Sequence, residues 1–352
     1  MTAAGKKLAQ IVAPDQTRLG FMLPYTPLHL LLLEPAPGYP EVLVMTSGNL
    51  SEEPIAYDNA EARERLASLA DGFLMHDRPI YMRIDDSVVT MLREKPYLVR
   101  RARGFAPQQL RLPWEAMPLL ATGTELKNSF CLTRERYAFV SHYIGDLENQ
   151  ETLSAFEQAI PHYEHVFRIQ PKALACDLHP DYLATRYAQA RSQAESLPLM
   201  AVQHHHAHIA SCITENGWAS HEPVIGLAYD GTGYGTDGTI WGGEILIASY
   251  KDFTRRFHLA PVLLPGGDLA VSKPARMALS YLFAAGMDIE DQILAPVTYL
   301  TPDEIQAVRH QARTGFNAPL TSSMGRLFDA VAALIGLCEE ISYEAQAAMA
   351  LE

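Results

Sequence analysis

The fold of this chain is decided by the stretch Ala201-Val-Gln-His-His-His-Ala-His-Ile-Ala210. The apolar run Leu199–Val202 predicts a strand leaving the core, and the segment after it predicts a helix. His204 and His208 would then lie one turn apart on one helix face, the spacing that a helix-borne metal site needs. His205 and His206 are expected to point elsewhere on the helix. A solvated histidine-rich turn is the alternative for this pattern.

A second stretch starts with the apolar residues 224–229 and continues as Asp230-Gly-Thr-Gly-Tyr-Gly-Thr-Asp-Gly238. Its four glycines allow backbone N–H groups to approach an anion closely, although a wide hairpin has the same composition. No Gly-Lys-Ser/Thr follows, and a strand follows where the dinucleotide fingerprint needs a helix. A strand, a glycine-rich turn and a returning strand are how actin-like and sugar-kinase-like ATPases hold phosphate.

Length, charge and cysteine content indicate the general class of this protein. The chain has 352 residues, enough for two domains, and a formal net charge of −13 that argues against a general nucleic-acid surface. Its four cysteines are far apart and include no C-x-x-C pair, which indicates a reducing cytosol. The N-terminus lacks the apolar region of a signal peptide, and no apolar run is long enough to span a bilayer. We expect a cytoplasmic protein with no membrane partner.

Local patterns predict the remaining elements. Thr26-Pro27 predicts the start of a helix, residues 41–46 a buried strand, residues 59–70 an amphipathic helix, and residues 73–76 and 87–92 two more strands. Further on we expect a hairpin of residues 130–133 and 137–142, and a capping box at Thr301. Arg100-Arg-Ala-Arg103 predicts an anion contact, with a solvated charge run as the alternative.

The order of eight motifs resembles the hydrogenase maturation carbamoyltransferases, the HypF family. They are Thr46-Ser-Gly-Asn-Leu-Ser51, Arg100-Arg-Ala-Arg-Gly104, Glu125-Leu-Lys-Asn128, Asp177-Leu-His-Pro180, Gln203-His-His-His-Ala-His208, Asp230-Gly-Thr-Gly-Tyr234, Leu264-Pro-Gly-Gly-Asp268 and Gly325-Arg-Leu-Phe-Asp329. The resemblance covers nearly the whole chain, and the combination of the last four motifs is specific.

The resemblance implies an α/β protein in two parts. Residues 1–105 would be the C-terminal part of a YrdC-like domain, residues 106–115 a linker, and residues 116–352 a Kae1-like domain of the actin/sugar-kinase (ASKHA) superfamily. The family's acylphosphatase domain and zinc-finger modules have no counterpart here, and neither does its C-terminal aspartate metal ligand. We therefore expect a fragment, truncated in its Kae1-like domain, with a weak metal site.

The implied activity is carbamoyl transfer to the C-terminal cysteine of a maturation partner, HypE. Carbamoyl phosphate would supply carbamate, which ATP with magnesium would activate as carbamoyl-adenylate in the YrdC-like domain. By resemblance His204 and His208 bind one divalent metal, iron or zinc, and act in catalysis with Asp230. The implied nucleotide- and phosphate-binding residues are Thr46, Ser47, Asn49, Arg101, Arg103, Lys127, Gly231, Thr232, Gly233, Arg326 and Glu344.

Three other functions fit parts of the pattern. The tRNA threonylcarbamoyl transfer machinery uses the same two folds, usually on separate chains. Antibiotic O-carbamoyltransferases fuse the two folds as this chain does. A non-catalytic module that binds metal and nucleotide is the third. Fusion on one chain and the third histidine in His204-His-His-Ala-His208 favour the hydrogenase maturation family.

Overall fold

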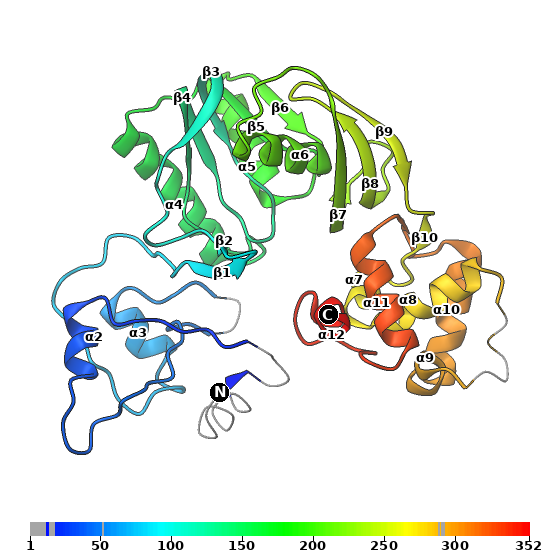
Figure 1. The fold of residues 1–352 in the computed structure, drawn as a ribbon, viewed down its shortest axis with the longest axis horizontal. Coiled ribbons are helices and arrows are strands. Elements are labelled where there is room, and N and C mark those ends of the chain that lie inside the picture. Colours follow the sequence, from blue (N-terminus) through cyan, green and yellow to red (C-terminus); the bar gives the residue numbers. More distant parts are fainter. Residues whose placement is uncertain (1–11, 14–17, 51–52, 288, 290–292) are drawn as a thin grey trace. The chain divides into compact units, whose positions relative to one another are not determined.

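The computed structural model describes residues 12–13, 18–50, 53–287, 289 and 293–352. Two compact units divide the chain, one spanning residues 1–51 and 55–80 and the other residues 52–54 and 81–352. The described part of the first unit contains α2 (Pro27–Leu32) and α3 (Asn59–Arg65) (Figure 1). α2 starts as the Thr26-Pro27 pair predicts, because the Thr26 hydroxyl accepts the N–H of His29.

Two strands predicted for the first unit are wrong. Residues 41–46 and 73–76 form no strand, and Val42 is 68% exposed where a buried strand was expected. A strand is stable only when its backbone N–H and C=O groups pair with a neighbour. No described segment pairs with either stretch, so their apolar composition alone does not make them strands.

The second unit begins with a hairpin and a four-stranded sheet. The hairpin joins β1 (Val88–Leu92) to β2 (Lys95–Arg100). The sheet has the order β4-β3-β5-β6, with β3 (Leu110–Ala121) antiparallel to β4 (Cys131–Val140) and parallel to β5 (Ala173–Asp177), and with β6 (Leu199–Val202) parallel to β5. Its helices are α4 (Gln150–Phe167), α5 (Leu183–Glu195) and α6 (His204–Glu215). Leu120, Phe130, Phe156 and Leu174 are fully buried in its core.

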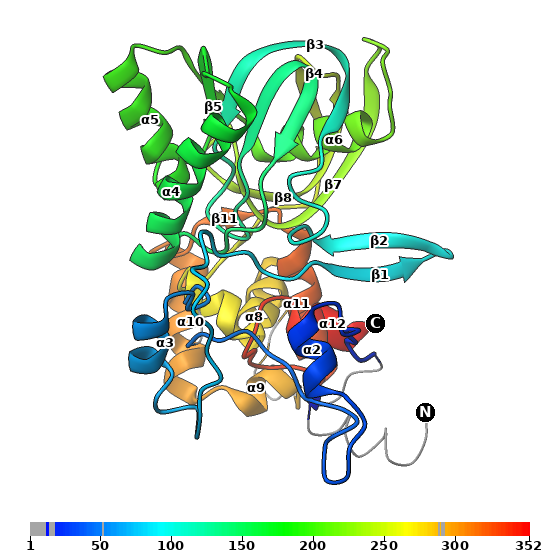
Figure 2. The same ribbon diagram turned by 90° about the vertical axis from the view of Figure 1, so that its left-hand side faces the viewer.

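A second sheet follows along the chain. β8 (Ile240–Ala248) pairs with β7 (Val224–Tyr234) and β9 (Phe253–His258), and β11 (Leu320–Thr321) joins β8 to β10 (Val262–Leu263). The helices of this half are α7 (Asp268–Ser272), α8 (Pro274–Ala284), α9 (Ala295–Tyr299), α10 (Pro302–Thr314), α11 (Met324–Leu334) and α12 (Gln346–Leu351) (Figure 1; all but α7 are also labelled in Figure 2). The capping box predicted at Thr301 starts α10.

Two strands are longer than the sequence predicts. β4 runs without a turn through Arg134-Glu-Arg136, so the expected hairpin is absent there; Glu135 has φ 54°, and the pairing beside it is irregular because β3 has extra residues on both sides of Ala116. β3 begins at Leu110, inside the predicted linker of residues 106–115. In the part of the chain that the structure describes, no helix has the length and apolar character needed to cross a bilayer.

α6 connects the two sheets of the second unit. It leaves β6 of the first sheet, yet its Ile209 packs in a buried cluster with Ala228, Leu246 and Ala248 of the second sheet. The contact is close because β7 has a glycine at this point. A Cβ at Gly226 would lie 2.2 Å from Cδ1 of Ile209. This packing places the N-terminal turn of α6 beside the end of β7.

Replacing Gly226 with alanine tests this packing. We expect Gly226→Ala to lower the free energy of unfolding by about 1–3 kcal/mol through overpacking, and Ile209→Ala to lower it by about 2–5 kcal/mol through a cavity. In the double variant the new methyl group enters the vacated space, so the loss should be smaller than the sum. Urea denaturation of the four proteins measures this, and strictly additive losses would contradict the contact.

Candidate functional site

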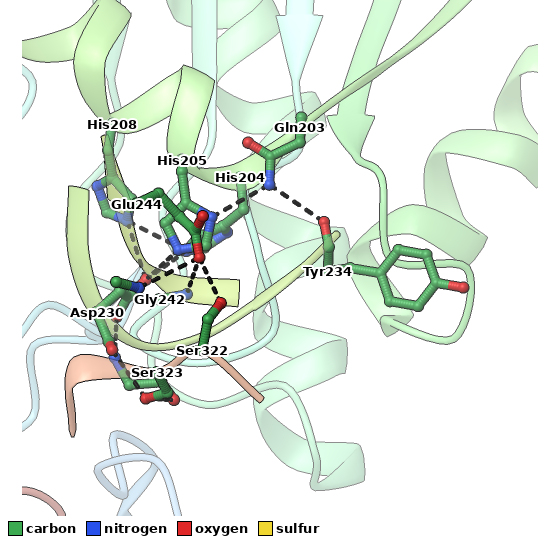
Figure 3. Close-up of polar contacts among 12 residues, drawn as sticks. Gln203, His204, His205, His208, Asp230, Tyr234, Gly242, Glu244, Ser322 and Ser323 are labelled. Atoms are coloured by element: carbon green, nitrogen blue, oxygen red, sulfur yellow. Dashed lines mark hydrogen bonds and ion pairs between the residues drawn. The ribbon is translucent and has the colours of Figure 1, made fainter. Parts of the chain in front are cut away.

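The first part of the site is the N-terminus of α6, shown in Figure 3. Gln203 caps the helix, and its side-chain oxygen accepts the N–H of His206. The helix starts at His204, so His204 and His208 lie one turn apart as the sequence predicts. Their Nε2 atoms are 3.1 Å from each other. The Nε2 atoms of the two histidines therefore lie next to each other. The His204 side chain is mostly buried, and the His208 side chain is exposed.

The second part is Asp230 on β7. Its Oδ2 lies 3.1 Å from Nε2 of His204 and 3.4 Å from Nε2 of His208. Its Oδ1 accepts the N–H of Gly231 at 2.6 Å, which fixes the carboxylate plane. β7 does not end at Tyr229 as predicted but continues through the glycines to Tyr234, with a bulge between Tyr229 and Gly233. Asp230 therefore lies at the bulge of a strand rather than in a loop.

These three side chains can hold a metal ion. One ligand atom from each of His204, His208 and Asp230 lies within 4.8 Å of the others. In a tetrahedral site with bonds of about 2.0–2.1 Å, neighbouring ligand atoms are roughly 3.3 Å apart. The observed separations of 3.1 Å and 3.4 Å fit that geometry. Two imidazoles and one carboxylate are the donor set of divalent transition metals.

Asp177 orients the first of the two histidines. It is the last residue of β5 and only 6% exposed, and its Oδ2 accepts a hydrogen bond from Nδ1 of His204 at 2.8 Å. Its Oδ1 accepts the N–H of His179 at 2.8 Å. A hydrogen on Nδ1 leaves the lone pair of His204 on Nε2, the atom that faces Asp230. Asp177 was not among the predicted site residues. A signal existed, because β5 is parallel to β6 and Asp177 at the end of β5 lies opposite Val202 at the end of β6.

The carboxylates determine the charge of His204. Burial lowers the pKa of His204, but its hydrogen bonds with Asp177 and Asp230 outweigh burial and raise the pKa to about 9. Burial raises the pKa of Asp230, and the contacts with His204 and His208 outweigh it, so this pKa lies well below its usual range. Without a metal, His204 is therefore an imidazolium at neutral pH. A metal ion must displace its proton.

The two remaining histidines of the stretch differ from each other. His206 points away as expected, with Nε2 2.7 Å from the carbonyl oxygen of Ser249. The expectation was wrong for His205, because its Nε2 lies 3.8 Å from Oδ2 of Asp230. Burial lowers the pKa of His205 to about 4, and the nearby charge of His204 adds to this effect, so the ring is neutral.

The glycine stretch packs against protein atoms. A Cβ at Gly233 would lie 2.4 Å from Cε1 of His205, so a glycine is needed there for the imidazole. Gly231 contacts the start of α11, because the hydroxyl of Ser323 donates to the carbonyl oxygens of Asp230 and Gly231. Thr232 lies between Gly231 and Gly233 on β7. That these residues cradle a phosphate stays a prediction.

Arg326 and Lys127 are both engaged in ion pairs. Nε of Arg326, in the first turn of α11, lies 2.8 Å from a carboxylate oxygen of the buried Asp329. Lys127 and Glu344, two predicted nucleotide contacts, form an ion pair with each other although they are far apart in sequence. A nucleotide phosphate at either basic side chain would compete with these carboxylates.

The predicted adenylation residues are divided between the two units. Thr46, Ser47 and Asn49 belong to the first unit, and Arg101 and Arg103 to the second. Arg101 donates to the carbonyl oxygen of Gln108 at 2.5 Å, and Arg103 pairs with Asp86 at 3.3 Å. Their assembly into one adenylation pocket stays a prediction.

Comparisons with known proteins cover the whole chain. Residues 226–352 match the family described as carbamoyltransferase, Kae1-like domain, second subdomain. Residues 115–215 match the HypF Kae1-like domain, and residues 1–102 match the Sua5/YciO/YrdC family described as telomere recombination.

Individual relatives agree with these matches. The chain is 47% identical to carbamoyltransferase HypF of Rhodobacter capsulatus, over 100% of this chain and 47% of that protein. It is 46% identical to carbamoyltransferase HypF2 of Cupriavidus necator, over 97% of this chain and 43% of that protein. A crystal structure of full-length HypF in a phosphate- and nucleotide-bound form gives a TM-score of 0.85 at 46% identity, covering 95% of this chain and 43% of that one. The chain thus spans about half the length of the curated relatives it matches.

The charge of His204 predicts how stability depends on pH in the metal-free protein. Its folded pKa of about 9 lies above the ordinary value of 6.5, so the stabilisation is fully present below about pH 6.5. It is lost as pH rises towards 9. Urea denaturation in a chelator should show this loss in the wild type and a smaller loss in His204→Gln. Equal pH dependence in both proteins would contradict the assignment.

Asp177→Asn should weaken zinc binding by about 10–100-fold. The asparagine oxygen can still accept from His179, which turns the amide nitrogen towards Nδ1 of His204. His204 would then carry its hydrogen on Nε2, which blocks the ligand atom. Competition with a chromophoric chelator measures the affinity. Asp181→Asn is the matched control, because Asp181 is an exposed carboxylate paired with Arg186, and an equal loss there would refute the role of Asp177.

Proposed function

The chain belongs to the HypF carbamoyltransferase family, and from this premise we propose that it activates a carbamoyl group with ATP and transfers it to a cysteine thiol. The YrdC-like part is proposed to form carbamoyl-adenylate, and the Kae1-like part to complete the transfer. The acceptor is the C-terminal cysteine of a HypE-like maturation protein. We place the reaction in the cytoplasm, in keeping with the free state of Cys131, Cys176, Cys212 and Cys338.

One observation carries the proposal: the ligand atoms of His204, His208 and Asp230 come together from a helix and a strand. A site held by a helix and a strand keeps its geometry better than one on a loop. His204, His208 and Asp230 would hold an iron or zinc ion there. When bound, such a metal supplies Lewis-acid polarisation of the carbamoyl oxygen and stabilises developing charge.

Hydrolysis of carbamoyl phosphate supplies the carbamate and releases phosphate, and two further steps follow. In the first, a carbamate oxygen bonds to the α-phosphorus of ATP, whose bond to the pyrophosphate breaks, and magnesium pyrophosphate leaves. In the second, the acceptor thiolate bonds to the carbamoyl carbon, and the bond to the AMP oxygen breaks. The proposed contacts of the adenylation step are Thr46, Ser47, Asn49, Arg101 and Arg103.

The Kae1-like part is proposed to bind the phosphate of the nucleotide. The proposed phosphate contacts are Lys127, Gly231, Thr232, Gly233 and Arg326, and Glu344 is a proposed contact of the nucleotide outside its phosphates, because a carboxylate and a phosphate repel each other. Lys127 and Arg326 supply positive charge in a chain of net charge −13, and each is paired with a carboxylate in the structure. At Lys127 the paired carboxylate of Glu344 is exposed, so a phosphate can replace it at little cost.

A chimera tests the proposal. Exchanging the matching half of the Rhodobacter capsulatus relative for this chain yields a protein with all of that relative's domains. We expect it to release pyrophosphate from ATP only when carbamoyl phosphate is present, and to carbamoylate the C-terminal cysteine of a HypE-like acceptor. The same chimera with His204→Gln and His208→Gln should still release pyrophosphate but transfer more than about a hundredfold more slowly, since metal polarisation contributes several kcal/mol.

A His206→Gln chimera is the control for changes in α6 that leave the metal ligands intact. Mass spectrometry of the acceptor measures transfer, and a coupled assay measures pyrophosphate. Pyrophosphate release without carbamoyl phosphate would contradict the adenylation step. Transfer that survives the loss of both histidines would contradict the metal site.

A further inference from the structure

His205 is a buried polar side chain without a hydrogen-bond partner at one of its nitrogens. The side chain has no exposed surface, and its Nε2 makes no hydrogen bond within the described structure. This atom points towards Oδ2 of Asp230 at 3.8 Å (Figure 3). Three histidine Nε2 atoms thus face one carboxylate oxygen, but only those of His204 and His208 form with Asp230 a group of ligand atoms within 4.8 Å of one another.

Gln203 decides which nitrogen of His205 carries the hydrogen. The Oε1 atom of Gln203 accepts the backbone N–H of His206 at 2.9 Å, and its Nε2 donates to the backbone carbonyl of Tyr234 at 3.2 Å. Both partners are backbone groups with fixed roles, so the amide cannot be flipped. The same amide nitrogen lies 3.1 Å from Nδ1 of His205. Nδ1 must therefore accept, and in the neutral ring Nε2 carries the hydrogen.

The ring of His205 is also held in place. It stacks on Trp241 with an interplanar angle of 28°, and Gly233 passes so close that a Cβ there would overlap Cε1. Rotation away from Asp230 would break the hydrogen bond with Gln203. The N–H of His205 is consequently aimed at the Asp230 carboxylate by packing on both sides.

We propose that His205 is not a metal ligand but a positioning residue whose Nε2–H donates to Oδ2 of Asp230 in the metal-bound state. The inference rests on the proposed metal site of His204, His208 and Asp230. A metal ion takes the Nε2 lone pairs of both ligand histidines, so neither can then donate to Asp230. Oδ1 is already occupied by the N–H of Gly231. A shift of roughly 0.8 Å brings Oδ2 within 3.0 Å of His205.

This arrangement keeps a third imidazole out of the metal's ligand set. A coordination position that is left without a protein ligand can take a substrate oxygen. The hydrogen on Nε2 of His205 therefore keeps one such position free of this side chain. The donor also holds Asp230 in the orientation that the metal needs.

The tautomer can be measured in the metal-free wild type. Long-range ¹H–¹⁵N correlation spectra of the imidazole rings distinguish Nε2–H, Nδ1–H and charged histidines. We expect His205 to give the pattern of a neutral ring with hydrogen on Nε2. An Nδ1–H or charged ring at His205 overturns the inference, and this measurement requires no variant to fold.

Metal affinity distinguishes whether His205 positions Asp230 or has no part in metal binding. We expect His205→Phe to bind Zn²⁺ about tenfold or more weakly than the wild type, and His205→Gln, which keeps an N–H donor at similar reach, to regain most of that affinity. His206→Gln is the matched control from the same helix and should bind as the wild type does. X-ray absorption of the zinc-loaded wild type should count two histidine nitrogens, and His205→Phe should keep both.

The outcomes distinguish this inference from the proposed function. A wild type that binds no Zn²⁺ overturns the metal site and this inference together. A wild type that binds while His205→Phe binds equally well overturns only the role of His205. A third histidine in the wild-type spectrum, lost in His205→Phe, makes His205 a ligand and also overturns it. Should His205→Phe fail to fold, His205→Gln decides, because affinity as low as that of His204→Gln contradicts a donor role.

Discussion

The contact between the Asp230 carboxylate and the histidines of α6 is the interaction on which the rest of the second unit depends. A half-buried carboxylate is costly unless opposite charge or donors meet it. His204 meets it at 3.1 Å, and Asp177 meets the other side of the same ring at 2.8 Å. The result is a chain of carboxylate, imidazole and carboxylate that joins β5 of the first sheet to β7 of the second.

Glycines make this contact possible. Gly226 lets α6 approach β7, Gly233 makes space for His205, and a Cβ at Gly242 would lie 2.5 Å from the carbonyl oxygen of Asp230. Each is required by a neighbouring atom rather than by a left-handed backbone, since none of these three has a positive φ. The glycines of this region therefore set how closely a strand and a helix can pack around the Asp230 side chain.

A second set of polar contacts holds β7 and β8 on the side of α11. The buried carboxylate of Glu244 receives hydrogen bonds from Arg255 and Ser322, which ties β8 to β9 and to the segment before α11. Ser323, the N-cap of α11, donates to the carbonyl oxygen of Asp230. The backbone of Asp230 is thus fixed from α11 while its side chain is fixed from α6.

The sequence predicted those parts of the site that depend on local pattern. The spacing of His204 and His208 and the strand before them follow from helical and apolar periodicity, and both are confirmed. The roles of Asp177, Gln203 and His205 could not be read in the same way. Each acts through a partner 25 or more positions away, which only the packing of the two sheets brings close. The strand expected at residues 41–46 failed for the same reason, because pairing is a tertiary property.

The most direct test of this account is anomalous diffraction from a crystal of the chain soaked in zinc, recorded on both sides of the zinc absorption edge. The account predicts one dominant anomalous peak bonded to Nε2 of His204, Nε2 of His208 and a carboxylate oxygen of Asp230. His205 should lie outside the bonding distance, with its Nε2 turned to the other lone pair of that oxygen. A peak bonded to His205, or no peak between α6 and β7, would contradict it.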